Sequence, residues 1–199
     1  MSERLATLTH RDANWAGLRV VVTGLGVSGF AAADALLERG AEVLVVDGAH
    51  PDGILAERAN ILDILGARLA FGPDAVARMP DTPVDLVVTS PGWRPDQPLL
   101  AAAAAAGIPV WGEVELAWRM RPEHGGAPWL AVTGTNGKTT TVQMLTSILR
   151  AAGLRACSAG NVGTPILEAV VHPDPFDVIA VELSSFQLHW SHSLAPQAS

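Results

Sequence analysis

Lysine and cysteine are both scarce in this sequence, and each shortage excludes a class of protein. Lys138 is the only lysine among 13 basic residues, and the net charge of the 199-residue chain is −7. A surface that binds nucleic acid needs clustered basic side chains, so the composition argues against a nucleic-acid partner. Cys157 is the single cysteine, which excludes an internal disulfide and a cysteine-rich metal site. We therefore expect a reducing, cytoplasmic location.

Long apolar segments are missing as well. The longest apolar run covers residues 99–111 and is interrupted by Gly107 and Pro109, so it is too short to cross a bilayer. Residues 1–15 carry several charged side chains, unlike the apolar core of a signal peptide, and are expected to form a short lead-in. We expect no membrane segment.

The first part of the chain alternates valine-rich and leucine-rich runs with helical stretches. With 49% hydrophobic residues the chain has enough apolar side chains to fold around a core. The alternation predicts an α/β fold in which a parallel sheet is covered by helices. The expected strands are Arg19–Thr23, Glu42–Val46 and Asp85–Thr89, and the expected helices are Ser28–Arg39, Ile54–Leu65 and Pro98–Ala106. We assign residues 1–120 to a Rossmann-like domain.

A second α/β unit follows a short linker. Residues 121–128 contain two prolines and two glycines, which is typical of a linker. Residues 129–199 then predict the first part of a P-loop ATPase-type domain. Its expected elements are strands at Trp129–Thr133, Arg155–Ala159 and Asp177–Leu183, and a helix at Thr139–Ala152. Three strands leave a sheet poorly covered, so we expect that the chain is truncated or that a partner completes it.

The first glycine-rich loop predicts a nucleotide site. Gly24, Gly26 and Gly29 form a G-x-G-x-x-G pattern between a strand and a helix, where a backbone can approach a pyrophosphate. Asp47 ends the next strand, where a ribose-binding carboxylate would lie. The alternative is a tight turn with packing glycines, and the spacing does not separate NAD from another nucleotide. Ser90 begins a Ser-Pro-Gly turn at the same sheet edge.

The second glycine-rich loop predicts phosphate binding more strongly. Its residues are Gly134, Thr135, Asn136, Gly137, Lys138, Thr139 and Thr140. Backbone N–H groups of such a loop surround phosphates, the lysine reaches the β- and γ-phosphates, and the threonine hydroxyl binds Mg²⁺. Val132 stands where the strict P-loop pattern has glycine, so the loop is a variant. The only lysine of the chain occupies the position where a compact ammonium is needed.

A P-loop site also needs a carboxylate at the end of a nearby strand to hold the metal. Glu182 is placed there, although a glutamate at a strand end is often only solvated. Ser184 and Gln187 follow on the next loop, and Asn161 lies in a further loop at the same edge. His189 and His192 lack a third metal ligand, so we interpret them as surface residues.

Three segments in this order resemble the ATP-dependent Mur ligases of peptidoglycan synthesis. They are the loop Gly134–Thr140, the sequence Gly-Asn-Val-Gly at 160–163, and Glu-Leu-Ser-Ser-Phe-Gln-Leu at 182–188. The third segment, combined with the G-x-G-x-x-G loop, is most similar to the family members that join D-glutamate to UDP-N-acetylmuramoyl-L-alanine. The resemblance extends from about Leu18 to Leu188.

The resemblance implies roles for individual residues. Lys138 and its loop would bind the ATP phosphates, and Thr139 and Glu182 would hold Mg²⁺, with Lys138 and Glu182 as the catalytic pair. The first glycine-rich loop would hold the uridine diphosphate rather than NAD. Implied substrate contacts are Gly24, Gly26, Val27, Ser28, Gly29, Asp47, Ser90, Asn161, Ser184 and Gln187. In this family the substrate carboxylate attacks the γ-phosphate of ATP to give an acyl phosphate, and the amine of D-glutamate then displaces phosphate from it.

Two departures from the family pattern matter. Gly48 and Ala49 stand where relatives can offer polar side chains to the nucleotide. The family's carbamylated lysine, its later metal-binding histidine and its D-glutamate-binding domain would lie beyond Ser199. We therefore expect the 199-residue chain to bind nucleotide weakly without ligating, and the full-length enzyme to be a monomer. The alternatives are another Mur-type ligase, an NAD-dependent oxidoreductase using the first loop, and a nucleotide-sensing regulatory module.

Overall fold

Two parallel β-sheets organise the protein in the computed structural model, which describes residues 3–199. The first sheet has the order β3-β2-β1-β4-β5. Its strands are β1 (Arg19–Thr23), β2 (Glu42–Asp47), β3 (Arg68–Phe71), β4 (Leu86–Thr89) and β5 (Val110–Gly112). The strand order reverses between β1 and β4, and ligands of open α/β sheets bind in the crevice at such a point.

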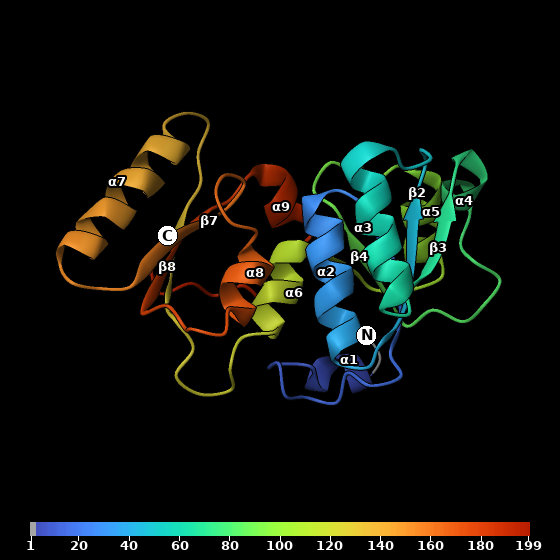
Figure 1. Cartoon of the computed structure of the whole chain (residues 1–199), viewed down its shortest axis with the longest axis horizontal. Coiled ribbons are helices and arrows are strands. Elements are labelled where there is room, and N and C mark those ends of the chain that lie inside the picture. Colours follow the sequence, from blue (N-terminus) through green and yellow to red (C-terminus); the bar gives the residue numbers. More distant parts are fainter. Residues whose placement is uncertain (1–2) are drawn as a thin grey trace.

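Helices cover both faces of the first sheet (Figure 1). They are α2 (Val27–Glu38), α3 (Gly53–Ile64), α4 (Pro73–Ala77), α5 (Pro98–Ala105) and α6 (Glu113–Arg119). Helices α2, α3 and α6 contribute to one hydrophobic cluster with Val20 and Val22 of β1, whereas α5 packs with Val21 on the opposite face. A strand buried on both faces accounts for the uninterrupted valine run of β1.

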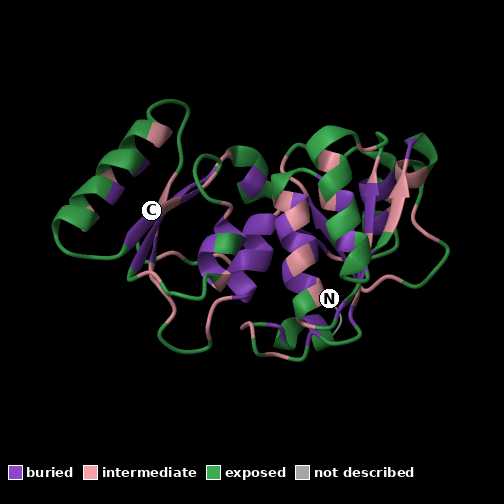
Figure 2. Ribbon diagram, viewed as in Figure 1, coloured by how far each residue is buried: buried purple, intermediate pink, exposed green. Residues whose placement is uncertain are grey.

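The second sheet has the order β6-β8-β7. Its strands are β6 (Trp129–Val132), β7 (Ala156–Gly160) and β8 (Val178–Glu182), and its helices are α7 (Lys138–Ala151), α8 (Ile166–Val171) and α9 (Ser185–His189). Helix α7 exposes Met144 and Ile148, and Figure 2 shows its outer surface as mostly exposed. Strand β6 pairs with β8 along one side and lies at the edge of this sheet. Along its free side, the Ala131 N–H donates to the Ala198 carbonyl at 2.8 Å, so the end of the described chain pairs with β6.

The only cysteine lies in the second sheet. Cys157 is in β7, paired in register with Ile179 of β8, and its side chain is buried in the main hydrophobic cluster. Burial raises the pKa of the Cys157 thiol to about 11. The thiol is therefore protonated at neutral pH.

Helices α2, α6 and α8 join the two sheets through one continuous core. Helix α8, from the second unit, packs against α6 and α2 of the first. Trp118 and Trp129 meet edge to face across this junction, with ring centroids 5.1 Å apart. The main hydrophobic cluster contains residues of both sheets, so the two units share their interior.

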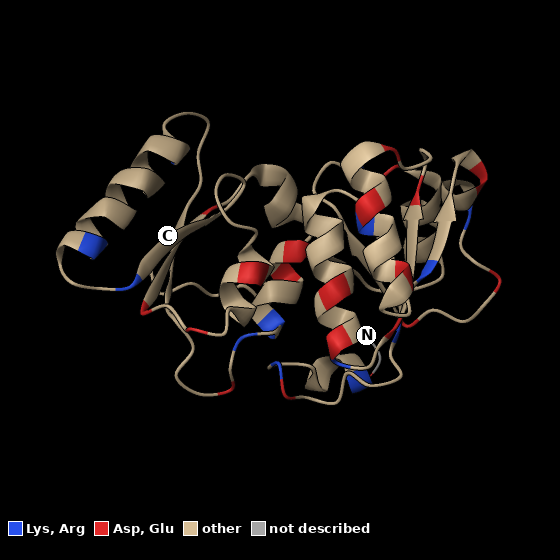
Figure 3. Cartoon of the chain, viewed as in Figure 1, with Lys and Arg blue, Asp and Glu red and all other residues tan. Residues whose placement is uncertain are grey.

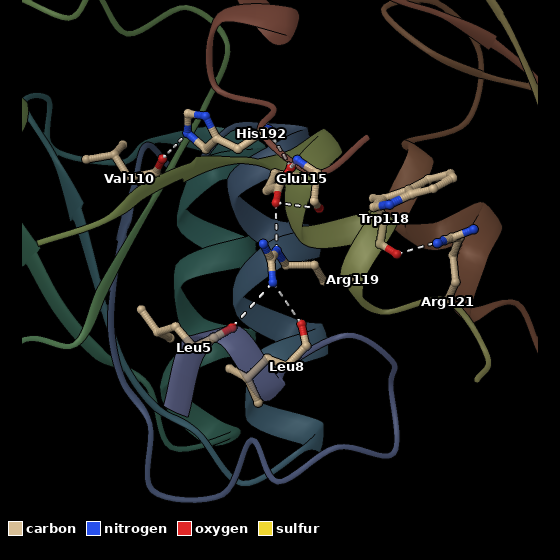
Figure 4. Close-up of polar contacts among 9 residues, drawn as sticks. Leu5, Leu8, Val110, Glu115, Trp118, Arg119, Arg121 and His192 are labelled. Atoms are coloured by element: carbon tan, nitrogen blue, oxygen red, sulfur yellow. Dashed lines mark hydrogen bonds and ion pairs between the residues drawn. The ribbon is translucent and has the colours of Figure 1, made fainter. Parts of the chain in front are cut away.

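A buried ion pair lies at the same junction (Figure 4). Arg119 Nε donates to Glu115 Oε1 at 2.6 Å, and the backbone N–H groups of His192 and Ser193 donate to Glu115 Oε2 at 2.7 and 2.9 Å. Burial opposes ionisation of Glu115, but hydrogen bonds from Ser193, Arg119 and His192 outweigh it and lower the pKa of that carboxyl. The pair therefore ties α6 to the segment that follows α9.

The N-terminal segment is part of the core, so the expectation of a simple lead-in was wrong. Helix α1 (Glu3–Thr7) buries Leu5, and Leu8 and Trp15 are equally buried. Arg119 also donates to the carbonyl oxygens of Leu5 and Leu8 at 3.3 and 3.2 Å. Charged residues of the segment, such as Glu3 and Asp12, are exposed. Three isolated apolar residues between charged ones form no recognisable pattern, so the sequence did not predict their burial.

The strands and helices expected from the sequence are confirmed to within one or two residues at each end. Elements that the sequence analysis did not assign are α1, β3, α4, β5, α6, α8 and α9. Figure 3 shows basic residues spread over both units and mixed with acidic ones. Among the helices formed by residues 3–199, none combines the length and the apolar character needed to cross a membrane.

Candidate functional site

The first glycine-rich loop turns tightly from β1 into α2. Gly24 has a φ of 87°, and the backbone at Gly29 passes so close that a Cβ there would lie 1.9 Å from the Gly24 carbonyl oxygen. Gly26 has free space around it, since a Cβ added there would have no heavy atom within 4 Å. The three glycines therefore have different structural roles. Gly24 adopts the positive φ of the turn, Gly26 leaves the loop backbone accessible to a ligand, and Gly29 allows α2 to pack closely against the end of β1.

Asp47 lies beside this loop, where the sequence placed it. Its Oδ2 accepts the Leu25 N–H at 2.9 Å, and its Oδ1 accepts the Ala49 N–H at 3.1 Å. The carboxylate thus fixes the glycine-rich loop to the end of β2. Asp47 also lines a small pocket together with Leu55 and Phe71.

Ser90 also packs against the first loop. Its hydroxyl donates to the Thr23 carbonyl at 2.7 Å, and Thr23 and Thr89 are joined by a 2.9 Å hydrogen bond between their hydroxyls. A Cβ at Gly24 would lie 3.0 Å from Ser90 Oγ and 3.2 Å from Trp93 Nε1. The ends of β1 and β4 therefore form one compact rim at the point where the strand order reverses.

The second glycine-rich loop connects β6 to α7. Gly137 is the N-cap of α7 with a φ of 76°, a left-handed conformation that favours glycine. Lys138 Nζ donates to the Gly134 carbonyl at 2.8 Å, so the lysine folds back over its own loop. Thr135, Asn136 and Thr140 are exposed. Unpaired N–H groups at the start of a helix attract anions, and the loop presents them together with one ammonium.

Glu182 lies at the centre of a polar cluster at the end of β8. It is 2% exposed, and β8 runs between β6 and β7, with Val132 and Gly160 as its neighbours in register. Thr139 Oγ1 donates to Glu182 Oε2 at 2.8 Å, and Asn161 Nδ2 donates to Glu182 Oε1 at 3.2 Å. The structure thus brings three predicted site residues into contact, from the first turn of α7, the loop after β7 and the end of β8.

The donor set of this cluster fits Mg²⁺. A carboxylate, a hydroxyl and an amide are hard oxygen-bearing groups, and Mg²⁺ is typically held by one or two carboxylates while keeping water and phosphate ligands. Within residues 3–199 no group of three or more histidine, cysteine, aspartate or glutamate side chains could hold a metal ion. His189 and His192 are both exposed, in agreement with their interpretation as surface residues.

Ser184 and Gln187 contact one another at the start of α9. Ser184 Oγ accepts the Gln187 N–H at 3.3 Å, and Gln187 Oε1 accepts the Ser184 N–H at 2.9 Å, which together form a capping box. Gln187 is buried, so its amide is used mainly to fix the loop that follows Glu182.

A cleft between the two units is lined by aromatic side chains. It has a volume of about 440 Å³ and lies between Phe186 and the loop that follows Ser90, with Pro91, Gly92, Trp93, Arg94 and Pro95 as its other walls. Phe186 is two-thirds exposed. No role was assigned to Trp93 or Phe186 from the sequence, although Trp93 follows the Ser-Pro-Gly turn and Phe186 lies within the segment 182–188. The available signal was an aromatic residue in or beside a polar motif.

Two descriptions of protein domains match this chain. "Mur ligase MurD-like, N-terminal domain" matches residues 18–112, and "Mur ligase middle domain" matches residues 132–197. Together they cover the first sheet, both glycine-rich loops and most of the second sheet. The chain belongs to the Mur ligase family.

Several curated proteins in the Mur ligase family are similar to this chain over most of its length. A protein of Thermobifida fusca is 58% identical over 185 residues, covering 92% of this chain and 38% of the relative. A protein of Streptomyces avermitilis is 56% identical over 181 residues, covering 91% of this chain and 38% of the relative. Both are named "UDP-N-acetylmuramoylalanine--D-glutamate ligase". The chain thus spans 38% of the length of these relatives.

Proposed function

We propose that this chain supplies the UDP-substrate site and the nucleotide-binding part of a UDP-N-acetylmuramoyl-L-alanine:D-glutamate ligase. The observation that carries the proposal is the contact of Thr139 and Asn161 with Glu182 beside a P-loop-type turn. That cluster is the arrangement needed for a metal-bound nucleoside triphosphate. The names of the similar proteins support D-glutamate as the amino acid.

The proposed domains follow the two sheets. Residues 1–120 would bind the uridine diphosphate end of the substrate at Gly24–Gly29, Asp47 and Ser90. Residues 129–199 would bind ATP at Gly134–Thr140, and residues 121–128 would link the two. The aromatic cleft lies between Trp93, in the loop after β4, and Phe186, in α9. In this proposal it would give the substrate a path from one site to the other. The proposed enzyme acts in the cytoplasm as a monomer.

Each polar residue at the ATP site has a chemical task in this proposal. Lys138 would leave the Gly134 carbonyl and bind the β- and γ-phosphates, where its charge stabilises the transferring phosphoryl group. Thr139 and Glu182 would hold Mg²⁺, and Asn161 would keep the Glu182 carboxylate in position. Bound Mg²⁺ would neutralise charge on the phosphates. The substrate carboxylate would enter from the side of the aromatic cleft and attack the γ-phosphorus of ATP, so that ADP leaves and an acyl phosphate forms.

Ligand binding by the 199-residue chain tests the proposal. We expect MgATP and UDP-N-acetylmuramoyl-L-alanine each to raise the melting temperature, because a ligand that binds only the folded state stabilises it. A Lys138→Ala variant should bind MgATP about 10- to 100-fold more weakly, the effect of losing a charged hydrogen bond, in isothermal titration calorimetry.

The control is Gln143→Ala, on the exposed surface of the same helix, which should bind MgATP like the parent chain. Stabilisation by NADH with no response to the UDP-sugar would contradict the proposal and favour an NAD-dependent oxidoreductase. If the parent chain binds MgATP and the UDP-sugar but Lys138→Ala binds MgATP with the same affinity, the proposed phosphate-binding role of Lys138 is contradicted.

A further inference from the structure

A buried carboxylate that takes no part in the proposed chemistry lies at the junction of the two units. Glu113 is the first residue of α6 and is 3% exposed. It accepts the Leu167 N–H at 3.2 Å, at the beginning of α8. Pro165 is the N-cap of α8 and supplies no side-chain hydrogen bond. The Glu113 carboxylate therefore satisfies a helix-terminal amide of the second unit from within the first.

Helix α2, which begins within the first glycine-rich loop, packs against both α6 and α8, so it borders the site of this carboxylate. Burial raises the pKa of Glu113, and hydrogen bonds from Leu167, from the Ser28 hydroxyl and from Ile166 oppose that rise. Ser28 lies in the first turn of α2, within the predicted substrate loop. Because α2, α6 and α8 pack against one another, Glu113 occupies the space where the three helices meet.

Short connections run from α8 to the metal cluster. The loop before α8 contains Asn161, whose side chain donates to Glu182. The Asn161 N–H donates to the Glu182 carbonyl at 3.0 Å, and the Gly160 N–H donates to the Thr164 carbonyl at 3.0 Å. The loop is therefore fixed at both ends, so a displacement of α8 would be transmitted to Asn161.

We propose that Glu113 is a positioning residue that couples the first glycine-rich loop to the Asn161–Glu182–Thr139 cluster. Occupation of the first loop holds Ser28 and α2 in place, Glu113 holds α8 against them, and α8 holds Asn161 toward Glu182. UDP-N-acetylmuramoyl-L-alanine should consequently increase the affinity for MgATP, and by linkage MgATP should increase the affinity for the UDP-sugar. This inference rests on the proposed function.

Calorimetric titrations of the 199-residue chain with MgATP, with and without saturating UDP-N-acetylmuramoyl-L-alanine, measure the coupling. We expect the UDP-sugar to lower the dissociation constant of MgATP about fivefold or more, the usual lower range for coupled sites. Glu113→Ala should reduce this ratio to about one. Glu113→Gln keeps an oxygen that can accept the Leu167 N–H, so it should retain part of the coupling.

Glu168→Gln is the matched control, because Glu168 lies on α8 next to Leu167 but is exposed, and it should keep the full ratio. A purely structural role would lower the melting temperature of Glu113→Ala and leave the ratio unchanged, which would overturn the inference. If Glu113→Ala does not fold, Ser28→Ala tests the same connection from the other side, and an unchanged ratio there overturns it.

The outcomes also separate this inference from the proposed function. Binding of both ligands without any mutual effect would overturn the coupling alone. Failure of the parent chain to bind either ligand would overturn both proposals.

Discussion

Gly29→Ala is expected to destabilise the protein by about 3 kcal/mol or more, the upper range for overpacking, because the new methyl group has no room. Its Cβ would lie 1.9 Å from the Gly24 carbonyl oxygen, which belongs to rigid backbone at the end of β1. Relief would require α2 to move away from the sheet. Urea unfolding followed by circular dichroism measures the loss.

Gly26→Ala in the same motif is the control. Nothing lies within 4 Å of its added Cβ, and Gly26 has a φ of −64°, which alanine adopts readily. We expect its stability to change by less than about 1 kcal/mol. The same variant should weaken binding of UDP-N-acetylmuramoyl-L-alanine, since a methyl group would block the backbone from a diphosphate. Equal losses of unfolding free energy in Gly29→Ala and Gly26→Ala would contradict the different structural roles of these two glycines.

Glu115→Ala is expected to cost about 3–5 kcal/mol, the range for breaking a buried ion pair by removing one partner. The Arg119 guanidinium would remain buried without a counter-charge, and the N–H groups of His192 and Ser193 would lose their acceptor. The segment after α9 should then detach from α6 (Figure 4). Urea unfolding gives the free energy, and hydrogen exchange at residues 191–193 reports the detachment.

Two comparisons make the Glu115 result specific. Asp81→Ala removes an ion pair of the same 2.6 Å length, between Arg78 and Asp81, but that pair is exposed and should contribute little. The double variant Glu115→Leu with Arg119→Met replaces both charges by apolar groups and should recover part of the loss. A small effect of Glu115→Ala would show that water reaches Arg119 at this junction.

The sequence predicted the parts of the molecule that depend on local chemistry. The strands β1, β2 and β4 were assigned because a strand buried on both faces needs an unbroken apolar run. Both glycine-rich loops were found because tight turns and close approaches need glycine at fixed spacing. The family resemblance implied that Thr139 and Glu182 hold the same metal ion, and the structure places the two side chains in hydrogen-bond contact.

Other features could not be predicted because their partners are distant in the chain. Strand β5 has three residues, too few to show a pattern. Glu113 and Glu115 resemble two solvated glutamates at a helix start, and only the folded chain places Leu167 and Ser193 against them. Asp47 was assigned to a ribose on its position alone, whereas the structure shows its two oxygens holding the Leu25 and Ala49 amides.

The buried Cys157 thiol of β7 can serve as a chemical probe of local opening in the second sheet. With a pKa of about 11 and a buried side chain, Cys157 should react very slowly with an aromatic disulfide reagent in the folded protein. Its labelling rate should therefore measure how often the core around β7 opens to solvent. Saturating MgATP should slow that rate several-fold by holding Glu182 and its neighbours together. Since no second cysteine competes for the reagent, labelling can follow the opening of one edge of the fold under fully native conditions.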